Sequence, residues 1–257
     1  MSKEENVDII LPNYNSSEYL ELTIKSVIGQ SYKNWNLIIV DDCSNEKTKI
    51  ILNKYSQHKN IQIVFLDKNK GAAFCRNFAL GLSKSEYVAF LDSDDLWSED
   101  KLTEQINFMK KNNYDFTYTN YTTFKNNTSS NIDMLNQNNI KPKKRYNFNS
   151  FIKDTSIATS TMVIKGQLAR KYEFADTKIC EDYFYKCSIL KEITYAYCLD
   201  KSFTSYRIRK NSLQAKKFRN LYWIWKINKD FNKLSFFKNL GSLIFISLSS
   251  LKRYGFK

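Results

Sequence analysis

The sequence predicts an α/β protein whose core is an open, mostly parallel sheet with helices on its faces. Two patterns predict it: apolar runs typical of buried strands alternate four times with segments of helical periodicity, and polar clusters stand where the runs end. The chain has 257 residues, 42% hydrophobic and 15% aromatic, which indicates a globular protein that can bury a sizeable core. We expect one large domain, or one domain with an appendage.

The alternation occupies roughly the first 90 residues. The apolar runs expected to form strands are residues 7–11, 37–40, 61–66 and 87–91. The helices between them are expected to reach about residue 30, about residue 57 and residue 82 in turn. Asn15 and Glu18 match a capping pair for the first of these helices.

The middle of the chain carries weaker patterns. Residues 115–124 alternate well enough for a strand, and residues 159–164 are expected to return to the sheet. Residues 125–139 are rich in Asn and Ser, which predicts a loop. A further helix is expected from Glu181 to Leu190.

Polar clusters lie at the carboxyl ends of all four strands. They are Tyr14-Asn15, Asp41-Asp42, Asn69-Lys70-Gly71 and Asp92-Ser93-Asp94-Asp95. In an open α/β sheet these ends line one crevice, and ligands bind there. We therefore expect four separate segments to bring their side chains to one site.

Asp92, Asp94 and Asp95 place three carboxylates within four positions. Like charges this close repel one another unless a cation lies among them, and ligands that are all oxygen favour Mg²⁺ or Mn²⁺ over Zn²⁺. The alternative is that Asp94 or Asp95 caps the next helix, whose sequence begins around residues 98–100. The acidic cluster predicts a divalent metal site.

The paired acids after the second strand suit a nucleoside. Asp41 and Asp42 can accept hydrogen bonds from a base or ribose, and Tyr14 can stack on the base. The alternative for Tyr14 is simple packing at the sheet edge. No G-x-G-x-x-G follows the first strand and no Walker loop is present, so a dinucleotide or ATP site lacks its usual signature.

The third cluster suits phosphate. Lys70 and Arg76 are cations placed to meet phosphate charge, and Gly71 lets the backbone come close. The alternatives are a helix-surface cation for Arg76 and an ordinary turn for Gly71. Together the clusters predict a nucleotide diphosphate held against a metal ion.

The order of these clusters resembles that of the family 2 glycosyltransferases of GT-A fold. The motifs that carry the resemblance are Pro12-Asn13-Tyr14-Asn15, Asp41-Asp42-Cys43-Ser44, Asn69-Lys70-Gly71 with Arg76-Asn77, Asp92-Ser93-Asp94-Asp95, Cys180-Glu181-Asp182, Tyr206-Arg207 and Asn211-Ser212. It spans about residues 7–212 and looks closest to bacterial enzymes that build teichuronic acid, capsule or O-antigen. The resemblance implies a Rossmann-like nucleotide-binding half and inverting, metal-dependent transfer from a nucleotide-diphosphate sugar, with uridine favoured by family habit.

The resemblance also implies roles for single residues. The nucleotide-sugar site would comprise Pro12, Tyr14, Asp41, Asp42, Lys70, Gly71, Arg76, Asp92 and Ser93. Asp94 would be the principal metal ligand, although Asp95 takes that part in some relatives. The acceptor side would contain Glu181, Tyr206 and Arg207, with Asp182 as the general base that deprotonates the acceptor hydroxyl. Phe74-Cys75 departs from the small residues common in the family at that point, which bears on the shape of the base pocket.

An alternative role for Asp182 is purely structural. Glu181-Asp182 opens a predicted helix, and acidic residues at a helix start are favoured by the helix dipole. In the implied mechanism, by contrast, the base must lie across the donor from Asp94, on the face opposite the leaving diphosphate.

Charge is distributed unevenly along the chain. Residues 1–200 hold 26 basic and 25 acidic side chains, whereas residues 201–257 hold 14 basic and one acidic. The tail therefore predicts an anionic partner, for which phospholipid headgroups and nucleic acid are the candidates. The five scattered cysteines, without a C-x-x-C pair, favour reduced thiols in the cytosol, and no secretory signal is visible at the start.

Two amphipathic helices are expected in this tail. Apolar residues recur at helical spacing from Ile224 to Leu234, and residues 240–251 are uncharged between basic flanks. That second segment, 12 residues long, falls short of the roughly 20 residues that span a bilayer. Aromatic and basic residues beside apolar helix faces indicate a helix in the membrane interface. The alternative is packing on the body or on a second subunit.

The sequence thus predicts a glycosyltransferase at the inner face of the cytoplasmic membrane, acting on a lipid-linked or polysaccharide acceptor and not on nucleic acid. Residues 1–213 would form the catalytic domain, with a donor half to residue 113 and an acceptor half after it, and residues 214–257 the basic helices. Three alternatives remain: a non-catalytic sugar-nucleotide-binding assembly subunit, a basic nucleic-acid-binding protein and, more weakly, a sugar nucleotidyltransferase.

Overall fold

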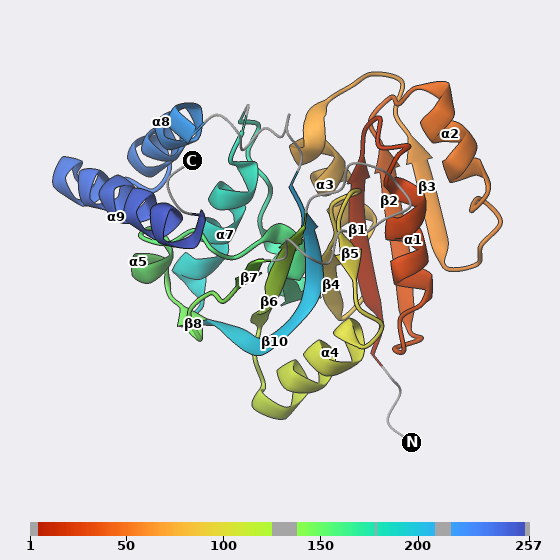
Figure 1. The fold of residues 1–257 in the computed structure, drawn as a ribbon, viewed down its shortest axis with the longest axis horizontal. Coiled ribbons are helices and arrows are strands. Elements are labelled where there is room, and N and C mark those ends of the chain that lie inside the picture. The colour runs from red at the N-terminus through yellow and green to blue at the C-terminus, as the bar shows by residue number, and fades with distance from the viewer. Residues whose placement is uncertain (1–4, 125–137, 178, 209–216, 255–257) are drawn as a thin grey trace.

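The computed structural model describes residues 5–124, 138–177, 179–208 and 217–254. Its described strands form one ten-stranded sheet with the order β3-β2-β1-β4-β9-β6-β10-β5, with β7 and β8 beside β6 and β10 (Figure 1). The four strands predicted first are parallel neighbours in this sheet: β1 (Val7–Asn13), β2 (Trp35–Asp41), β3 (Ile61–Phe65) and β4 (Tyr87–Phe90). The predicted α/β fold with a mostly parallel sheet is confirmed.

The predicted helices follow these strands with shifted ends. They are α1 (Leu20–Ile28), α2 (Glu46–Asn53), α3 (Gly71–Leu82) and α4 (Lys101–Asn112). The predicted cap of the first helix is wrong. Helix α1 begins at Leu20, and Asn15, at φ 49°, instead accepts a hydrogen bond from the backbone N–H of Asn45 at 2.8 Å.

The second half of the chain completes the sheet from the other side. Strand β9 (Val163–Lys165) runs antiparallel between β4 and β6, and the long β10 pairs in parallel with β6. The remaining elements are β5 (Leu96–Trp97), β6 (Phe116–Phe124), β7 (Asn138–Ile140), β8 (Arg145–Tyr146), β10 (Ala196–Arg207), α5 (Phe148–Phe151), α6 (Gly166–Lys171) and α7 (Glu181–Glu192). Of the predicted loop at 125–139, residues 125–137 lie outside the described residues, and 138–139 begin β7.

Apolar side chains cover both faces of the central strands. Ile9 and the side chains on its face pack against α1 and α4, whereas Ile10 and its face pack against α3 and α7. Both side chains are fully buried, as expected for strands covered by helices on both sides. This packing holds the carboxyl ends of β1, β2 and β4 at one edge of the molecule.

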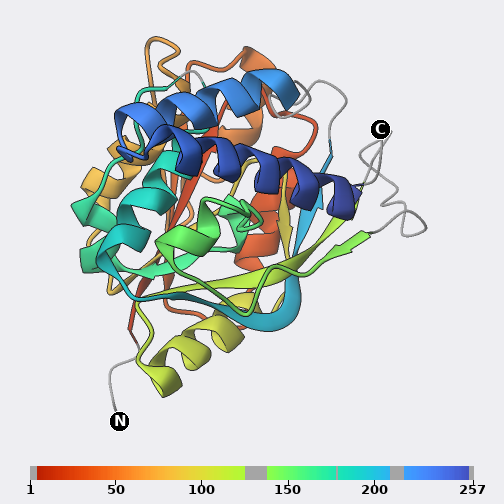
Figure 2. The same cartoon turned by 90° about the vertical axis from the view of Figure 1, so that its left-hand side faces the viewer.

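The tail forms two helices, α8 (Lys217–Asp230) and α9 (Phe236–Tyr254), which lie side by side across the front of α5 and α7 in Figure 2. Their inner faces join the core through Ile224, Ile227 and Ile246. Packing of the tail on the body, which the sequence left as the alternative to a membrane interface, is therefore present. Among the helices described, none is long and apolar enough to cross a membrane.

Candidate active site

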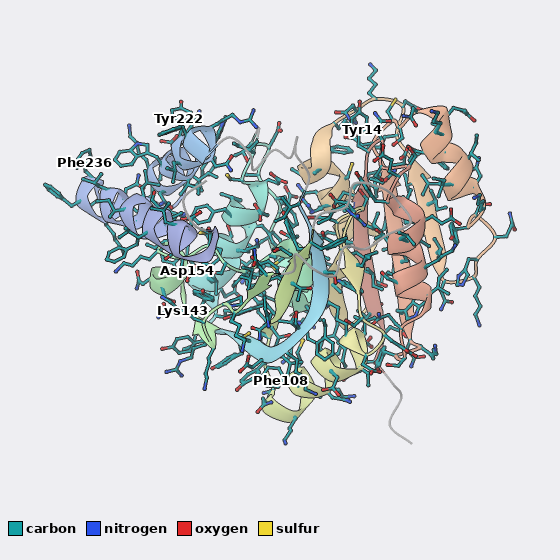
Figure 3. The ribbon with its side chains drawn as sticks, in the orientation of Figure 1. Tyr14, Phe108, Lys143, Asp154, Tyr222 and Phe236 are labelled. Atoms are coloured by element: carbon teal, nitrogen blue, oxygen red, sulfur yellow. The ribbon has the colours of Figure 1, made fainter. Side chains whose placement is uncertain are left out.

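The first two strand tips are tied together by their polar side chains. The Asn13 amide donates to Oδ1 of Asp41 at 2.5 Å, and the backbone N–H of Ser44 donates to Oδ2 at 3.0 Å. Both oxygens of Asp41 are thus engaged inside the protein, and its side chain is fully buried. Tyr14, beside this pair, is 52% exposed at the same edge of the sheet (Figure 3). Asp41 shapes the loop, and Tyr14 presents its ring to solvent.

Asp42 fixes the start of α3. Its two carboxylate oxygens accept the backbone N–H groups of Lys70 at 2.6 Å and Gly71 at 2.8 Å. Gly71 has a φ of 87°, a conformation that glycine adopts without steric cost. An acid that accepts the unpaired donors at a helix N-terminus stabilises that end of the helix. Asp42 of the second cluster is thus in direct contact with the backbone of the third cluster.

Arg76, on α3, joins the two halves of the chain. Its guanidinium donates to Asp92 at 2.6 Å and to Glu181 at 2.9 Å, and its side chain is 6% exposed. Burial acts to lower the pKa of Arg76, but the carboxylates of Asp92 and Glu181 outweigh it and raise the pKa, so the group stays charged. The cation is matched within the protein, which differs from the expected role of Arg76 as a cation open to phosphate.

Asp95 is a buried structural acid. Its carboxylate accepts the Ser160 hydroxyl at 2.6 Å and the backbone N–H of Arg207 at 2.9 Å. Burial raises the pKa of Asp95 well above its usual value, and the charges of Asp94 and Asp92 raise it further against these hydrogen bonds. The Arg207 side chain in turn donates to the carbonyl of Asp94 at 2.8 Å. Asp95 therefore connects the acidic strand end to β10.

The acidic cluster suits a divalent cation that a substrate helps to hold. No group of three or more His, Cys, Asp or Glu side chains in the described part of the chain is arranged as a metal cage. Mg²⁺ is usually bound through one or two carboxylates together with substrate phosphates, so a partial donor set fits this ion. Burial is the main cause of the raised pKa of Asp95, and the charges of Asp94 and Asp92 add to it, a repulsion that a cation would relieve.

Asp182 lies in the first turn of α7 and is held in its ionised form. Its Oδ2 accepts the Lys186 ammonium at 2.7 Å and the Thr159 hydroxyl at 3.2 Å. Burial alone would raise the pKa of Asp182, but the charge and hydrogen bond of Lys186, helped by Arg76 and Thr159, lower it below its usual value. This carboxylate is 34% exposed, so a ligand can reach it.

The contacts close into a ring that brings the predicted residues together. Arg76 links Asp92 to Glu181, whose neighbour Asp182 contacts Thr159. The next residue, Ser160, donates to Asp95 and also accepts the backbone N–H of Asp92, which returns the ring to its start. Four chain segments far apart in sequence thus meet at the carboxyl edge of the sheet. The expected convergence of β4 and the Glu181-Asp182 motif at one place is present.

The remaining predicted residues lie around this ring. The Lys70 ammonium lies 4.2 Å from the centre of the Phe74 ring, beside a pocket of about 340 Å³ whose lining includes Phe174 and Asp176. Burial raises the pKa of Tyr206 well above its usual value, and the charges of Asp95, Asp92 and Asp94 add to this rise. Pro12, near the end of β1, and Ser93, in the turn after β4, are half-buried. Asn211-Ser212 lies outside the described residues.

Sequence reasoning missed three residues of the ring and its supports. Lys186 carried a usable signal, because its position four residues after Asp182 on a helix predicts an ion pair. Thr159 and Ser160 carried none, since their segment was expected only to return to the sheet. The structure instead places both in a 3₁₀ turn (Thr159–Thr161) directly before β9.

Comparison with known proteins identifies the same family as the sequence motifs. The model of glycosyl transferase family 2 matches residues 8–172. The putative teichuronic acid biosynthesis glycosyltransferase TuaG of Bacillus subtilis is 31% identical over 248 residues, covering 96% of each chain. The UDP-Glc:alpha-D-GlcNAc-diphosphoundecaprenol beta-1,3-glucosyltransferase WfgD of Escherichia coli is 34% identical over 231 residues, covering 88% of this chain and 86% of that protein.

Solved structures share the fold. TarS 1–349 of S. aureus, in complex with UDP-GlcNAc, has a TM-score of 0.71 at 19% identity and covers 96% of this chain and 73% of that one. This chain spans 43% of the longer TarS chain. The mannosyltransferase PcManGT of Pyrobaculum calidifontis, in complex with GDP-Man and Mn²⁺, has a TM-score of 0.69 at 15% identity and covers 99% and 72%. With the matched family model and relatives over nearly its whole length, this chain belongs to glycosyl transferase family 2 and has the GT-A fold.

Proposed function

We propose that this glycosyltransferase moves a sugar from a UDP-sugar to an acceptor hydroxyl of a bacterial surface glycan, with inversion at the anomeric carbon. The observation that carries the proposal is the ring that joins Asp92 of the acidic strand end, through Arg76, to the Glu181-Asp182 turn. The names of two relatives support the substrates: TuaG is assigned to teichuronic acid biosynthesis, and WfgD uses UDP-Glc.

Asp182 is the proposed general base. Direct displacement at the anomeric carbon requires a carboxylate that takes the acceptor proton on the face opposite the leaving diphosphate. Within the described part of the chain, both hydrogen bonds to this carboxylate reach Oδ2, so we assign Oδ1 as the oxygen that receives the proton. Lys186 and Thr159 orient the group, and the lowered pKa of Asp182 keeps it ionised at neutral pH.

The donor side is built from β1, β2, β4 and the start of α3. Tyr14 is placed to stack on the base, while Pro12 and the loops fixed by Asp41 and Asp42 shape the pocket around it. Asp92, oriented by Arg76, and Ser93 are assigned to the ribose or donor sugar. Lys70 is exposed and supplies a positive charge for phosphate.

Asp94 is the residue we assign to hold a divalent cation, Mn²⁺ or Mg²⁺, with Asp92 beside it. When bound, the cation neutralises charge on the leaving diphosphate. Asp95 is less suited to this part than the sequence suggested, because both its oxygens accept hydrogen bonds from Ser160 and Arg207. Support for a metal comes from the complex of PcManGT, which contains Mn²⁺.

The acceptor side is assigned to Glu181, Tyr206 and Arg207, and the acceptor to a lipid-linked or polysaccharide glycan. WfgD, whose name gives a diphosphoundecaprenol-linked substrate, supports a lipid carrier. We place the enzyme at the inner face of the cytoplasmic membrane for the same reason. We also retain the division into a catalytic domain of residues 1–213, with donor and acceptor halves meeting near residue 113, and a basic helical part of residues 214–257.

A thermal-shift screen against nucleotide sugars tests the proposal. A bound donor at about 100 times its Kd stabilises the fold by about 2.7 kcal/mol, which raises Tm by about 5–10 °C. We expect this rise for a UDP-sugar with Mn²⁺, and its loss with a chelator or in Asp94→Ala. The control Asp115→Ala removes an exposed carboxylate just before β6, at the opposite edge of the sheet, and should retain the rise. Equal shifts in Asp94→Ala and the wild type would contradict the metal assignment.

Donor binding alone does not establish transfer. A wild-type protein that binds a UDP-sugar tightly, yet turns over no donor with any glycan or lipid acceptor, would instead indicate a sugar-nucleotide-binding assembly subunit. Inversion is checked separately by NMR of the anomeric proton in the product, where retained configuration would contradict it.

A further inference from the structure

We propose that the outward face of the α8–α9 pair is a docking surface for an anionic lipid bilayer. This inference deepens the proposed function, on which the choice of a bacterial membrane rests, by assigning the surface that meets it. The surface is defined by exposed residues of the two helices: Phe218, Tyr222, Phe237, Leu240, Ile244 and Leu248.

Helix α9 is more apolar on its exposed side than on its buried side. Phe237, Leu240, Ile244 and Leu248 recur at spacings of three and four residues, which places them in one stripe. Their exposures are 83%, 42%, 51% and 56%. The opposite side buries two polar residues, Asn239 and Ser242, beside Ile246. A helix built only to pack on the body would show the reverse arrangement.

Helix α8 extends this surface. Phe218 is 90% exposed and Tyr222 60% exposed, and Figure 2 shows α8 beside α9 on the same side of the molecule. Figure 3 shows Tyr222 and Phe236 at this end of the molecule, far from Tyr14. Of the large hydrophobic side chains that are exposed among the described residues, nine lie between Phe218 and Leu248 and four lie elsewhere. Scattered exposed apolar residues are ordinary, but a gathered patch marks an interaction site.

The positive charge of the tail favours an anionic bilayer over a second copy of the chain as the partner of this surface. The exposed lysines of this region are Lys226, Lys229, Lys233 and Lys238, against one acidic residue, Asp230. A second copy of the chain docking through the same surface would bring like charges together, because a twofold interface pairs identical patches. An anionic bilayer complements both features, since it accepts apolar side chains and each basic residue near it contributes about 1 kcal/mol.

The docking surface is held firmly on the catalytic body. The Tyr183 hydroxyl of α7 donates to the Asn228 side chain of α8 at 2.8 Å, and the Asn228 amide donates to Ser242 of α9 at 3.1 Å. Phe184 of α7 packs edge-on against Phe231 with ring centres 4.9 Å apart. Because α7 also carries Asp182, docking through α8 and α9 fixes the orientation of the proposed base relative to the membrane.

Vesicle sedimentation with the full chain, without donor or acceptor, tests the inference. We expect binding to phosphatidylcholine vesicles that contain about 30% phosphatidylglycerol, weaker binding to pure phosphatidylcholine, and a decrease as salt rises from about 0.05 to about 0.5 M. Ile244→Gln should lower the partition coefficient by about fivefold or more, because it removes an inserted apolar side chain. The matched control is Ile50→Gln, since Ile50 is 54% exposed on α2 at the other end of the molecule.

Three results would overturn the inference. The first is an absence of binding to anionic vesicles, and the second is an equal loss of binding in Ile244→Gln and Ile50→Gln. The third is a wild-type dimer in light scattering that Ile244→Gln converts to a monomer while vesicles bind neither form, which would assign the surface to a second copy. Tm of both variants should stay within about 2 °C of wild type, since exposed substitutions change stability little. The UDP-sugar shift, measured without vesicles, shows separately whether the transferase proposal holds.

Discussion

Lys186 lies one helical turn after Asp182, and its ammonium favours the ionised form of that carboxylate. The lysine is 3% exposed and also donates to the carbonyl of Ile157 at 2.7 Å, so it has little freedom to move away. Burial acts to raise the pKa of Asp182, and Lys186 is the largest influence in the other direction. The base of the proposed reaction therefore depends on a lysine that is almost completely buried.

Replacing Lys186 by Met should shift the pH dependence of transfer. The active base is the ionised form, so activity falls as the pH falls through the pKa of Asp182. Without the ammonium, less counteracts the effect of burial, so the pKa of Asp182 rises. The acidic limb of the kcat/KM profile therefore moves to higher pH. Lys191→Met, an exposed lysine on the same helix, is the control and should leave the limb in place. An unmoved limb in Lys186→Met would contradict the assignment of Asp182 as the titrating base.

At the residue scale, the sequence indicated the candidate site residues better than it indicated the hydrogen-bond partners of those residues. The acidic cluster was predicted from three carboxylates at one strand end, whereas the role of Asp182 was implied only by the family resemblance, because acidic residues at a helix start are common without a ligand. The engagement of Asp41 and Asp42 by backbone N–H groups was not predicted, since the loops that supply those groups take their shape only in the fold. The same holds for Arg76, whose charge is matched by residues 16 and 105 positions away.

At the scale of elements, Arg76 connects α3, β4 and α7. A buried guanidinium between two carboxylates leaves both acids unmatched when it is removed, and breaking such an arrangement costs about 3–5 kcal/mol. Arg76→Gln should lower the free energy of unfolding by about this amount in urea titrations. The control Lys171→Gln removes a lysine that is 57% exposed and paired with Glu192, for which we expect a much smaller loss, because solvent screens exposed ion pairs. Similar losses in the two variants would show that the three elements are not held together by Arg76.

The order of the elements was predictable, whereas their ends and their caps were not. Four apolar runs of buried residues gave β1 to β4, because short length and β-branched residues distinguish a buried strand from a buried helix where periodicity alone does not. The predicted cap at Asn15 and Glu18 was wrong, because the side chain of Asn15 accepts a hydrogen bond from the backbone N–H of Asn45 on the neighbouring loop. Strand β9, three residues long and antiparallel, is too short for its direction to be read from a pattern.

At the scale of the whole molecule, three parts meet around one edge of the sheet. The first half supplies the proposed donor side, the second half supplies the Glu181-Asp182 turn, and α8–α9 packs against α7 from outside. The sequence predicted the amphipathic tail from its periodicity and charge. The sequence could not predict that the side of α9 facing the core would carry polar residues. Its amphipathic pattern does not say which side of the helix packs on the body.

The central claim is that Asp182 removes the acceptor proton while the donor is held by the opposite half of the site. It is tested most directly by Asp182→Asn, with donor affinity measured by calorimetry and transfer measured in the same preparation. We expect Kd for the UDP-sugar to stay within about twofold and kcat to fall by about 10²–10⁴, the range contributed by a general base. Asp115→Asn, the exposed control, should change neither. Transfer by Asp182→Asn at the wild-type rate would contradict the account.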